Sequence, residues 1–190
     1  YTGAVNEYLF EGDNETATAN PLSIALANYA DLKVENLQLS GPDGSQAYTL
    51  NWDTSNRGTA VAPAGFLDRV RVRNQTTATT VFDQTYTNTT GLNTNSSVAR
   101  QATFTAATPG TYLVEVTTDS AQQIFEHDGV SHQAAEANNT ATTNFVITAF
   151  YTVTLNTSPA GAGTVSGAGT YAEGTSVTVS AVPVTTQAPY

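Results

Sequence analysis

Short segments in which every second residue is apolar recur along the chain, and a period of two is typical of half-buried β-strands. Segments 48–54 and 111–117 show it most clearly. Their apolar positions are Tyr48, Leu50 and Trp52 in the first segment and Tyr112, Val114 and Val116 in the second. No window of helical length carries a 3.6-residue period. The sequence therefore predicts an all-β fold of short antiparallel strands, separated by turns such as Pro109-Gly110.

Two segments indicate how the strands pack. In 69–73 arginine alternates with valine, so one face of that strand is cationic and must contact solvent or carboxylates. In 31–39 the apolar residues change faces near Glu35, which requires a β-bulge or a bend into a second sheet. A first strand of this kind favours two packed sheets over a closed barrel.

The chain also contains an internal repeat. Residues 6–13 are similar to residues 122–128 in their order of apolar and acidic side chains. Each copy then runs through a sequence rich in Asn, Thr and Ala to an apolar segment, 22–26 in the first copy and 145–147 in the second. The repeat predicts that 1–29 is the tail of a preceding domain of the same type and that the chain is one period of a tandem array.

Several short motifs follow one another between residues 30 and 149. They are Ala30-Asp31-Leu32-Lys33-Val34, Leu50-Asn51-Trp52-Asp53-Thr54-Ser55-Asn56-Arg57-Gly58, Asp68-Arg69-Val70, Pro109-Gly110-Thr111-Tyr112, Ile124-Phe125-Glu126 and Glu136-Ala137-Asn138-Asn139. In this order and spacing the stretch resembles CARDB, the cell-adhesion-related domain found in bacteria. The resemblance implies an immunoglobulin-like or fibronectin-type-III-like β-sandwich over 30–149.

A second set of motifs follows from Phe150 onward. They are Tyr151-Thr152-Val153-Thr154-Leu155, Pro159-Ala160-Gly161-Ala162-Gly163-Thr164-Val165, Gly169-Thr170-Tyr171 and Gly174-Thr175-Ser176-Val177-Thr178-Val179. This segment is similar to the first strands of a divergent internalin-type B-repeat. The resemblance implies that 150–190 is a partial β-repeat module, so that the central sandwich carries additional terminal β-strands from adjacent modules.

Charge narrows the range of partners. Sixteen acidic residues against 6 basic ones give a formal net charge of -10. Binding to phosphate backbones needs clustered Lys and Arg, so nucleic acid and anionic membrane surfaces are poor partners. The acidity is explained either by the solubility of an extracellular surface or by the binding of hard cations.

Cysteine content and apolar runs exclude two further features. With 0 cysteines the chain has neither disulfides nor thiol chemistry. It contains no apolar run long enough for membrane insertion.

Catalytic signatures are missing from the sequence. It has no cysteine nucleophile, no nucleophile elbow, no phosphate-binding glycine loop and no His-Glu-x-x-His motif. His127 and His132 could share a metal with Asp128, but we interpret them as exposed loop histidines. The carboxylate pair Asp53 and Asp68 has no sugar-binding aromatic residues beside it. We therefore expect no enzymatic activity.

Oxygen-bearing side chains concentrate around one loop near the end of the sandwich. They are Asp119, Glu126, Asp128, Glu136 and Asn138, and Glu11, Asp13 and Glu15 repeat the arrangement in the preceding copy. Hard cations prefer such oxygen-rich loops, and calcium between tandem modules would stiffen an extracellular rod. These residues are candidate calcium ligands, and a solvated acidic turn is the alternative.

Two functions fit these observations. The first is a non-catalytic structural or adhesive repeat of a large bacterial surface protein or fibre, with neighbouring copies or modules and a surface ligand as its partners. The second is an accessory spacer or carbohydrate-binding module of a secreted hydrolase. Trp52 lies on the apolar face of its strand and is expected in the core, not as a sugar platform. Both functions place the chain outside the cell or at the cell surface.

Assembly is expected to occur through the terminal segments. Their strands would add to the sheet of a neighbouring copy or, in a longer polypeptide, would complete the adjacent domains. The residues expected in these contacts are Tyr8, Leu9, Phe10, Leu22, Ile24 and Leu26.

Overall fold

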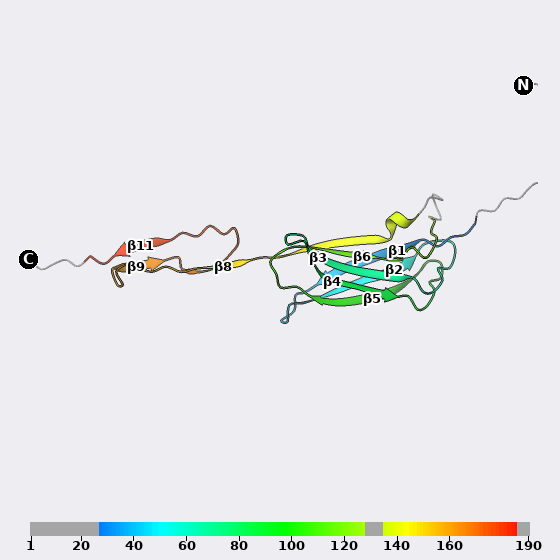
Figure 1. Ribbon diagram of the computed structural model, residues 1–190, viewed down its shortest axis with the longest axis horizontal. Helices are drawn as coiled ribbons and strands as arrows, with labels where there is room; N and C mark the ends of the chain where they lie inside the picture. Colours follow the sequence, from blue (N-terminus) through cyan, green and yellow to red (C-terminus); the bar gives the residue numbers. More distant parts are fainter. Residues whose placement is uncertain (1–26, 128–134, 186–190) are drawn as a thin grey trace, which may run out of the picture.

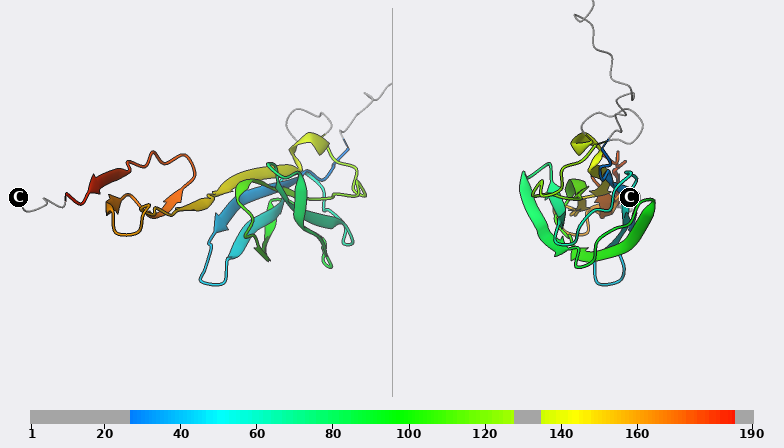
Figure 2. Two further views of the ribbon diagram at one scale, coloured as in Figure 1. Left: turned by 60° about the vertical axis from the view of Figure 1, so that its left-hand side comes forward. Right: turned by 90° about the vertical axis from the view of Figure 1, so that its right-hand side faces the viewer.

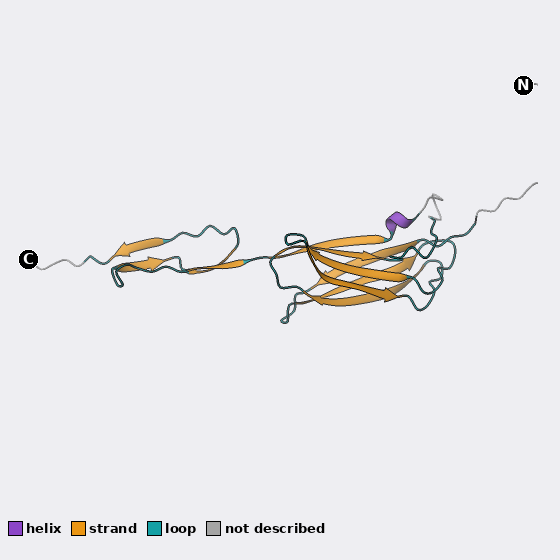
Figure 3. Ribbon diagram, in the orientation of Figure 1, coloured by secondary structure: helices purple, strands orange, loops and turns teal. Residues whose placement is uncertain are grey.

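The computed structural model describes residues 27–127 and 135–185, which form a β-sandwich followed by two smaller sheets (Figure 1). One sheet of the sandwich has the order β1-β2-β5 and contains β1 (Leu32–Ser40), β2 (Ala47–Asn56) and β5 (Ser96–Thr105). The other has the order β4-β3-β6-β7 and contains β3 (Leu67–Asn74), β4 (Thr79–Thr87), β6 (Gly110–Thr117) and β7 (Thr140–Ile147). Within the described ranges the one helix is the short 3-10 helix η2 (Glu136–Asn138) (Figure 3). The predicted all-β sandwich is confirmed.

Alternating residues of the central strands form the main core of the sandwich. The buried side chains of this main core are Tyr48, Leu50, Trp52, Val70, Val72, Ala102, Phe104, Ala106, Tyr112, Val114 and Val116. Burying a large apolar side chain contributes about 1.5–3 kcal/mol, so this cluster is what holds the sheets together. Trp52 is 2% exposed, which confirms its predicted place in the core.

Strand β1 contains the bulge that the sequence predicted near Glu35. Its pairing with β2 shifts register between Glu35 and Gln38, and Asn36 adopts a left-handed conformation with a φ of 52°. Asn tolerates this conformation better than most residues. After the bulge, Leu37 packs on the same core as Val34. Both halves of β1 pair with β2, so the alternative of a bend into the other sheet is wrong.

The arginine face of β3 points to solvent and contacts carboxylates of the neighbouring strands, as predicted. Arg69 pairs with Asp83 on β4 at 2.6 Å, and Arg71 pairs with Glu115 on β6 at 2.8 Å. Ion pairs exposed to this degree stabilise a fold by at most about 1 kcal/mol each. They cover the outer face of the sheet and leave the valines of β3 to the core.

A second apolar cluster closes the end of the sandwich where β1 begins. It consists of Ala30, Leu32, Ala62, Phe66, Leu92 and Ile124. The backbone passes close to itself here, because a Cβ on Gly58 would lie 2.3 Å from the carbonyl oxygen of Tyr29. Thr59 N and Ala60 N donate to the same carbonyl at 2.8 and 2.9 Å. These contacts hold the residues before β1 against the sandwich and so position one side of the site described below.

The segment after the sandwich forms paired strands without a core. It contains β8 (Phe150–Val153), β9 (Gly163–Ser166), β10 (Gly169–Ala172) and β11 (Ser180–Pro183), with β8 paired to β10 and β9 to β11. No residue between 150 and 185 is buried. Figure 1 and Figure 2 show the segment extending away from the end of the sandwich that carries the end of β7. Within the described part of the chain, no helix has the length and apolarity needed to cross a membrane.

The expected division into units 1–29, 30–149 and 150–190 stays a prediction. Residues 1–26 lie outside the described residues, and with them the first copy of the repeat. The expected assembly residues Tyr8, Leu9, Phe10, Leu22, Ile24 and Leu26 lie there as well.

Candidate metal centre

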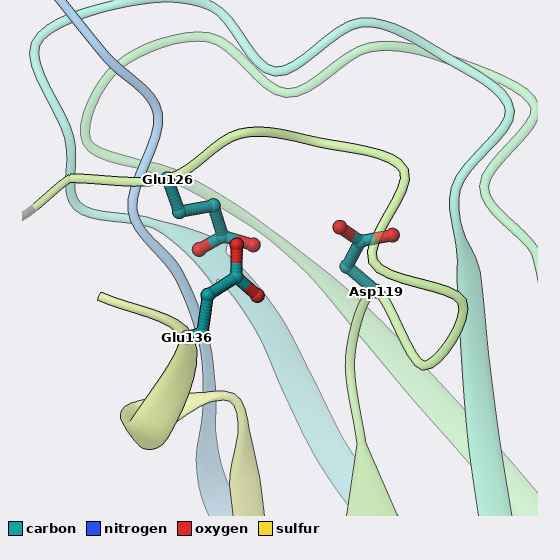
Figure 4. Close-up of side chains that lie close together, drawn as sticks. All are labelled: Asp119, Glu126 and Glu136. Atoms are coloured by element: carbon teal, nitrogen blue, oxygen red, sulfur yellow. The ribbon is translucent and has the colours of Figure 1, made fainter. Parts of the chain in front are cut away.

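Three carboxylates converge at the end of the sandwich where β1 begins (Figure 4). Asp119 follows β6, Glu126 lies further along the same connection, and Glu136 is the first residue of η2. One oxygen of each lies within 4.8 Å of the others. Asp119 and Glu126 are each 1% exposed, and Glu136 is partly buried. Three acids are therefore held together in a site that is largely removed from water.

Asp119 shapes the loop that presents Glu126. Its backbone has a φ of 41°, a left-handed conformation that Asp adopts more readily than bulky residues. Its Oδ1 accepts a hydrogen bond from Gln123 N at 2.9 Å, and its Oδ2 accepts one from Ile124 N at 2.8 Å. Each carboxylate oxygen has a second lone pair, so these bonds leave acceptor capacity toward the cluster.

Glu126 points inward because the segment that carries it is extended. Ile124 and Glu126 are buried, while Phe125 between them is 67% exposed, which is the alternation of a strand. Glu126 forms a parallel bridge with Ala30, and its Oε2 accepts a hydrogen bond from Leu32 N. The carboxylate of Glu126 therefore joins the start of β1 to the connection after β6.

Burial dominates the acidity of the site. It raises the pKa of Glu126 to about 7, and the negative charges of Glu136 and Asp119 add to the rise, while hydrogen bonds from Leu32 N and Asn139 oppose it. Burial also raises the pKa of Glu136, with a further contribution from Asp119. None of the ion pairs among the described residues involves these three acids. The site holds acidic groups without a basic partner, and a cation would supply the missing charge.

Asn139 completes the donor set. It is 3% exposed, and its Nδ2 donates to Glu126 Oε1 at 3.0 Å and to Glu136 Oε2 at 3.4 Å. Its Oδ1 is buried without a hydrogen-bond partner. A half-turn of this carboxamide exchanges its nitrogen and oxygen and turns the unpaired oxygen toward the carboxylates. Three carboxylates and an amide oxygen fit a hard cation such as calcium, whereas zinc favours nitrogen and sulfur ligands.

The structure brings together part of the predicted ligand set. Asp119, Glu126 and Glu136 form the cluster, and Asp128 lies outside the described residues. Asn138 turns its amide to a different carboxylate, since its Nδ2 donates to Asp31 Oδ1 at 2.8 Å. Asn139 was not among the predicted ligands, although it is adjacent to Asn138 in the same motif.

The other residues considered for chemistry have separate environments. His127 packs against the ring of Tyr29, with centroids 5.3 Å apart, and His132 lies outside the described residues. Asp68 is buried and accepts hydrogen bonds from the hydroxyls of Thr54 and Thr118 at 2.7 and 2.8 Å. Asp53 lies on the surface of β2, where it accepts a bond from Asn36 at 2.7 Å. These two acids therefore do not form a catalytic pair.

The architecture is that of a two-sheet β-sandwich with a cluster of three carboxylates at one end. The family model of CARDB matches residues 29–143. The chain therefore belongs to the CARDB family, a non-catalytic, adhesion-related module.

Solved structures with similar folds were also found. The CARDB domain of a Pyrococcus furiosus protein, crystallised in complex with di-metal ions, is 22% identical over 64% of this chain and 96% of that chain, with a TM-score of 0.44. Its solution structure gives 22% identity over 63% of this chain and 96% of that chain, with a TM-score of 0.43. β-Glucosidase 3B from Thermotoga neapolitana, in complex with glycerol, is 13% identical over 62% of this chain and 16% of that chain, with a TM-score of 0.38. No curated protein matches the chain.

Proposed function

We propose that the chain is a structural and adhesive module of an extracellular surface protein or fibre, and that calcium bound by Asp119, Glu126 and Glu136 stiffens it. One observation carries the proposal. The acid cluster lies where three separate segments meet, namely the start of β1, the connection after β6 and the turn before β7. A cation bound there would link the turn before the last strand of the sandwich to Glu126, which is hydrogen-bonded to the first strand.

The spacing of the cluster is compatible with a calcium ion. Calcium takes oxygen ligands at about 2.3–2.6 Å, so two oxygens on opposite sides of the ion are roughly 4.6–5.2 Å apart. The ligand oxygens here lie within 4.8 Å of one another, so one ion can contact all three carboxylates. The remaining ligands would come from Asn139 Oδ1 and from water.

Calorimetric titration of the full chain with calcium chloride tests the site. We expect heat of binding and a higher melting temperature, since calcium at a hundred times its Kd stabilises the folded state by about 2.7 kcal/mol. Glu136→Gln should lose both effects. Glu115→Gln removes one charge from the outer face of the sheet and should retain both. An absence of heat and of any melting shift at millimolar calcium would contradict the proposal.

We further propose that neighbouring copies or modules are the partners, and that they are joined by strand addition through residues 1–26. The outer strands β4 and β7 of one sheet and β1 and β5 of the other each have one edge without a strand partner among the described residues. Exposed edges of this kind accept additional strands. Removing residues 1–26 should abolish self-association while the sandwich stays folded. Unchanged association of the shortened chain in sedimentation experiments would exclude this mode of assembly.

A carbohydrate-binding module of a secreted hydrolase is the second candidate, and one surface favours it. The rings of Tyr29, Phe125 and His127 lie together beside a pocket of about 230 Å³, with the Tyr29 and Phe125 centroids 5.2 Å apart. Phe125 is 67% exposed, whereas Trp52 is buried and offers no platform. Binding of neutral glycans on an array by the wild-type chain, lost in Phe125→Ala, would favour this function. An array without any bound glycan would exclude it.

A further inference from the structure

Lys33, Asp31 and Asn138 meet beside the acid cluster. Lys33 Nζ lies 3.0 Å from Asp31 Oδ2, and Asn138 Nδ2 donates to Asp31 Oδ1 at 2.8 Å. The Asp31 side chain is 2% exposed, and that of Lys33 is 32% exposed. Lys33 is the single lysine of the chain. One buried carboxylate thus holds a primary amine at one oxygen and a carboxamide at the other.

The fold explains why these three groups meet. Asp31 and Lys33 are two residues apart along an extended segment, so their side chains point to the same face. Asn138 comes from η2, which packs against β1. The Oδ1 of Asn138 is buried and has no hydrogen-bond partner. A carbonyl in this state lacks the donor that it would have in water, and a protonated Asp31, whose carboxyl already contacts the Asn138 side chain, could supply one.

An ammonium next to a buried carboxylate can transfer its proton and become a neutral amine. A neutral amine is a nucleophile, and lysine carries it on a long flexible stem. The carboxamide of Asn138 is its electrophile, and both are already held at the same acid.

We propose that Lys33 and Asn138 become joined by an intramolecular isopeptide bond, with Asp31 as the proton carrier. Asp31 takes a proton from the Lys33 ammonium, and the free Nζ attacks Asn138 Cγ. The protonated Asp31 stabilises the oxygen of the tetrahedral intermediate and then passes a proton from Nζ to the departing Nδ2. The Cγ–Nδ2 bond breaks as the Cγ–Nζ amide forms, and one ammonia molecule leaves. No oxidant or other reactant is consumed.

The bond would change the mechanics of the sandwich. β1 is an outer strand of one sheet, and Asn138 lies two residues before β7, an outer strand of the other. When the chain is pulled, a covalent link between them carries the load, so the strands between Lys33 and Asn138 are not pulled apart. It would also restrict the unfolded chain in the way a disulfide does, in a protein that has 0 cysteines. The inference rests on these contacts alone and is independent of the proposed calcium site.

Intact mass spectrometry of the folded full chain tests the bond. We expect the wild type to weigh less than its sequence predicts by the mass of one ammonia molecule. Lys33→Arg keeps a cation beside Asp31 but lacks the nucleophilic amine, so it should have its full sequence mass. Asn138→Ala, which removes the electrophile, and Asp31→Asn, which cannot carry the proton, should also have full mass.

Tryptic mapping locates the link. In the cross-linked chain trypsin should not cut after Lys33, and a branched peptide containing both Lys33 and Asn138 should appear. A folded wild-type chain at its full sequence mass, cut after Lys33 and unchanged after prolonged incubation, would overturn the proposal. That result would leave calcium binding untouched, because calorimetry measures it separately.

Discussion

Glu126 is the residue whose ionisation should control stability most visibly. Its folded-state pKa of about 7 is above the ordinary value of 4.5, so the folded protein holds a proton that the unfolded chain has already lost. The stabilising contribution is therefore complete below about pH 4.5, falls as pH rises through 7, and is absent above it. Without divalent cations we expect the free energy of unfolding to fall by up to about 3 kcal/mol across this window.

Urea denaturation between pH 5 and 8 in the presence of a chelator measures this dependence. Glu126→Gln is the matched control, since it is neutral at every pH and its amide oxygen can still accept the bond from Leu32 N. The free energy of unfolding of this variant should lack the fall of up to about 3 kcal/mol that Glu126 causes in the wild type. Parallel curves for the two proteins would show that Glu126 titrates normally.

Single residues of the site differ in how far the sequence could predict them. Asp119, Glu126 and Glu136 were found because acids close together in sequence around one loop are also close in space. The amide of Asn139 and the pairing of Asn138 with Asp31 were not found. The first depends on a contact between Asn139 and Glu126, and the second joins η2 to the residue that precedes β1; local sequence does not encode such contacts.

At the level of elements, the alternating pattern located β2, β3 and β6, because each of these strands buries one face in the core. It also located the bulge in β1 at Glu35. It could not decide whether the strand then stays in its sheet, since that depends on hydrogen bonds with β2 and not on the direction of side chains. The C-terminal strands were expected from the resemblance to a β-repeat module and not from alternation, and no residue there is buried.

The close backbone contact between Gly58 and the residues before β1 gives a direct test of how the start of β1 is held. A Cβ at this position would lie 2.3 Å from Tyr29 O and 2.5 Å from the carbonyl carbon of Ala30. Gly58→Ala should therefore force the backbone apart and destabilise the fold by about 1–3 kcal/mol in urea denaturation. Gly44→Ala is the control, because no atom lies within 4 Å of its added Cβ. Equal stability of the two variants would contradict the tight crossing.

For the whole molecule, the structure predicts that the sandwich folds and unfolds cooperatively without help from the C-terminal strands. The segment 150–185 buries none of its residues, and isolated two-stranded sheets are marginally stable in water. A chain ending at Ala149 should therefore keep the melting temperature of the full chain within a few degrees. Calorimetric melting of both proteins checks this, and a large fall on truncation would show that the C-terminal strands contribute to the core.

The claim that a cation links the turn before the last strand to Glu126, and through its hydrogen bond to the first strand, is tested most directly by hydrogen exchange with and without calcium. We predict slower exchange in the presence of calcium at three separate places, namely residues 30–33, 119–127 and 136–139. Glu136→Gln should show none of these changes. Slower exchange confined to one acidic loop, or the same exchange with and without calcium, would contradict the account.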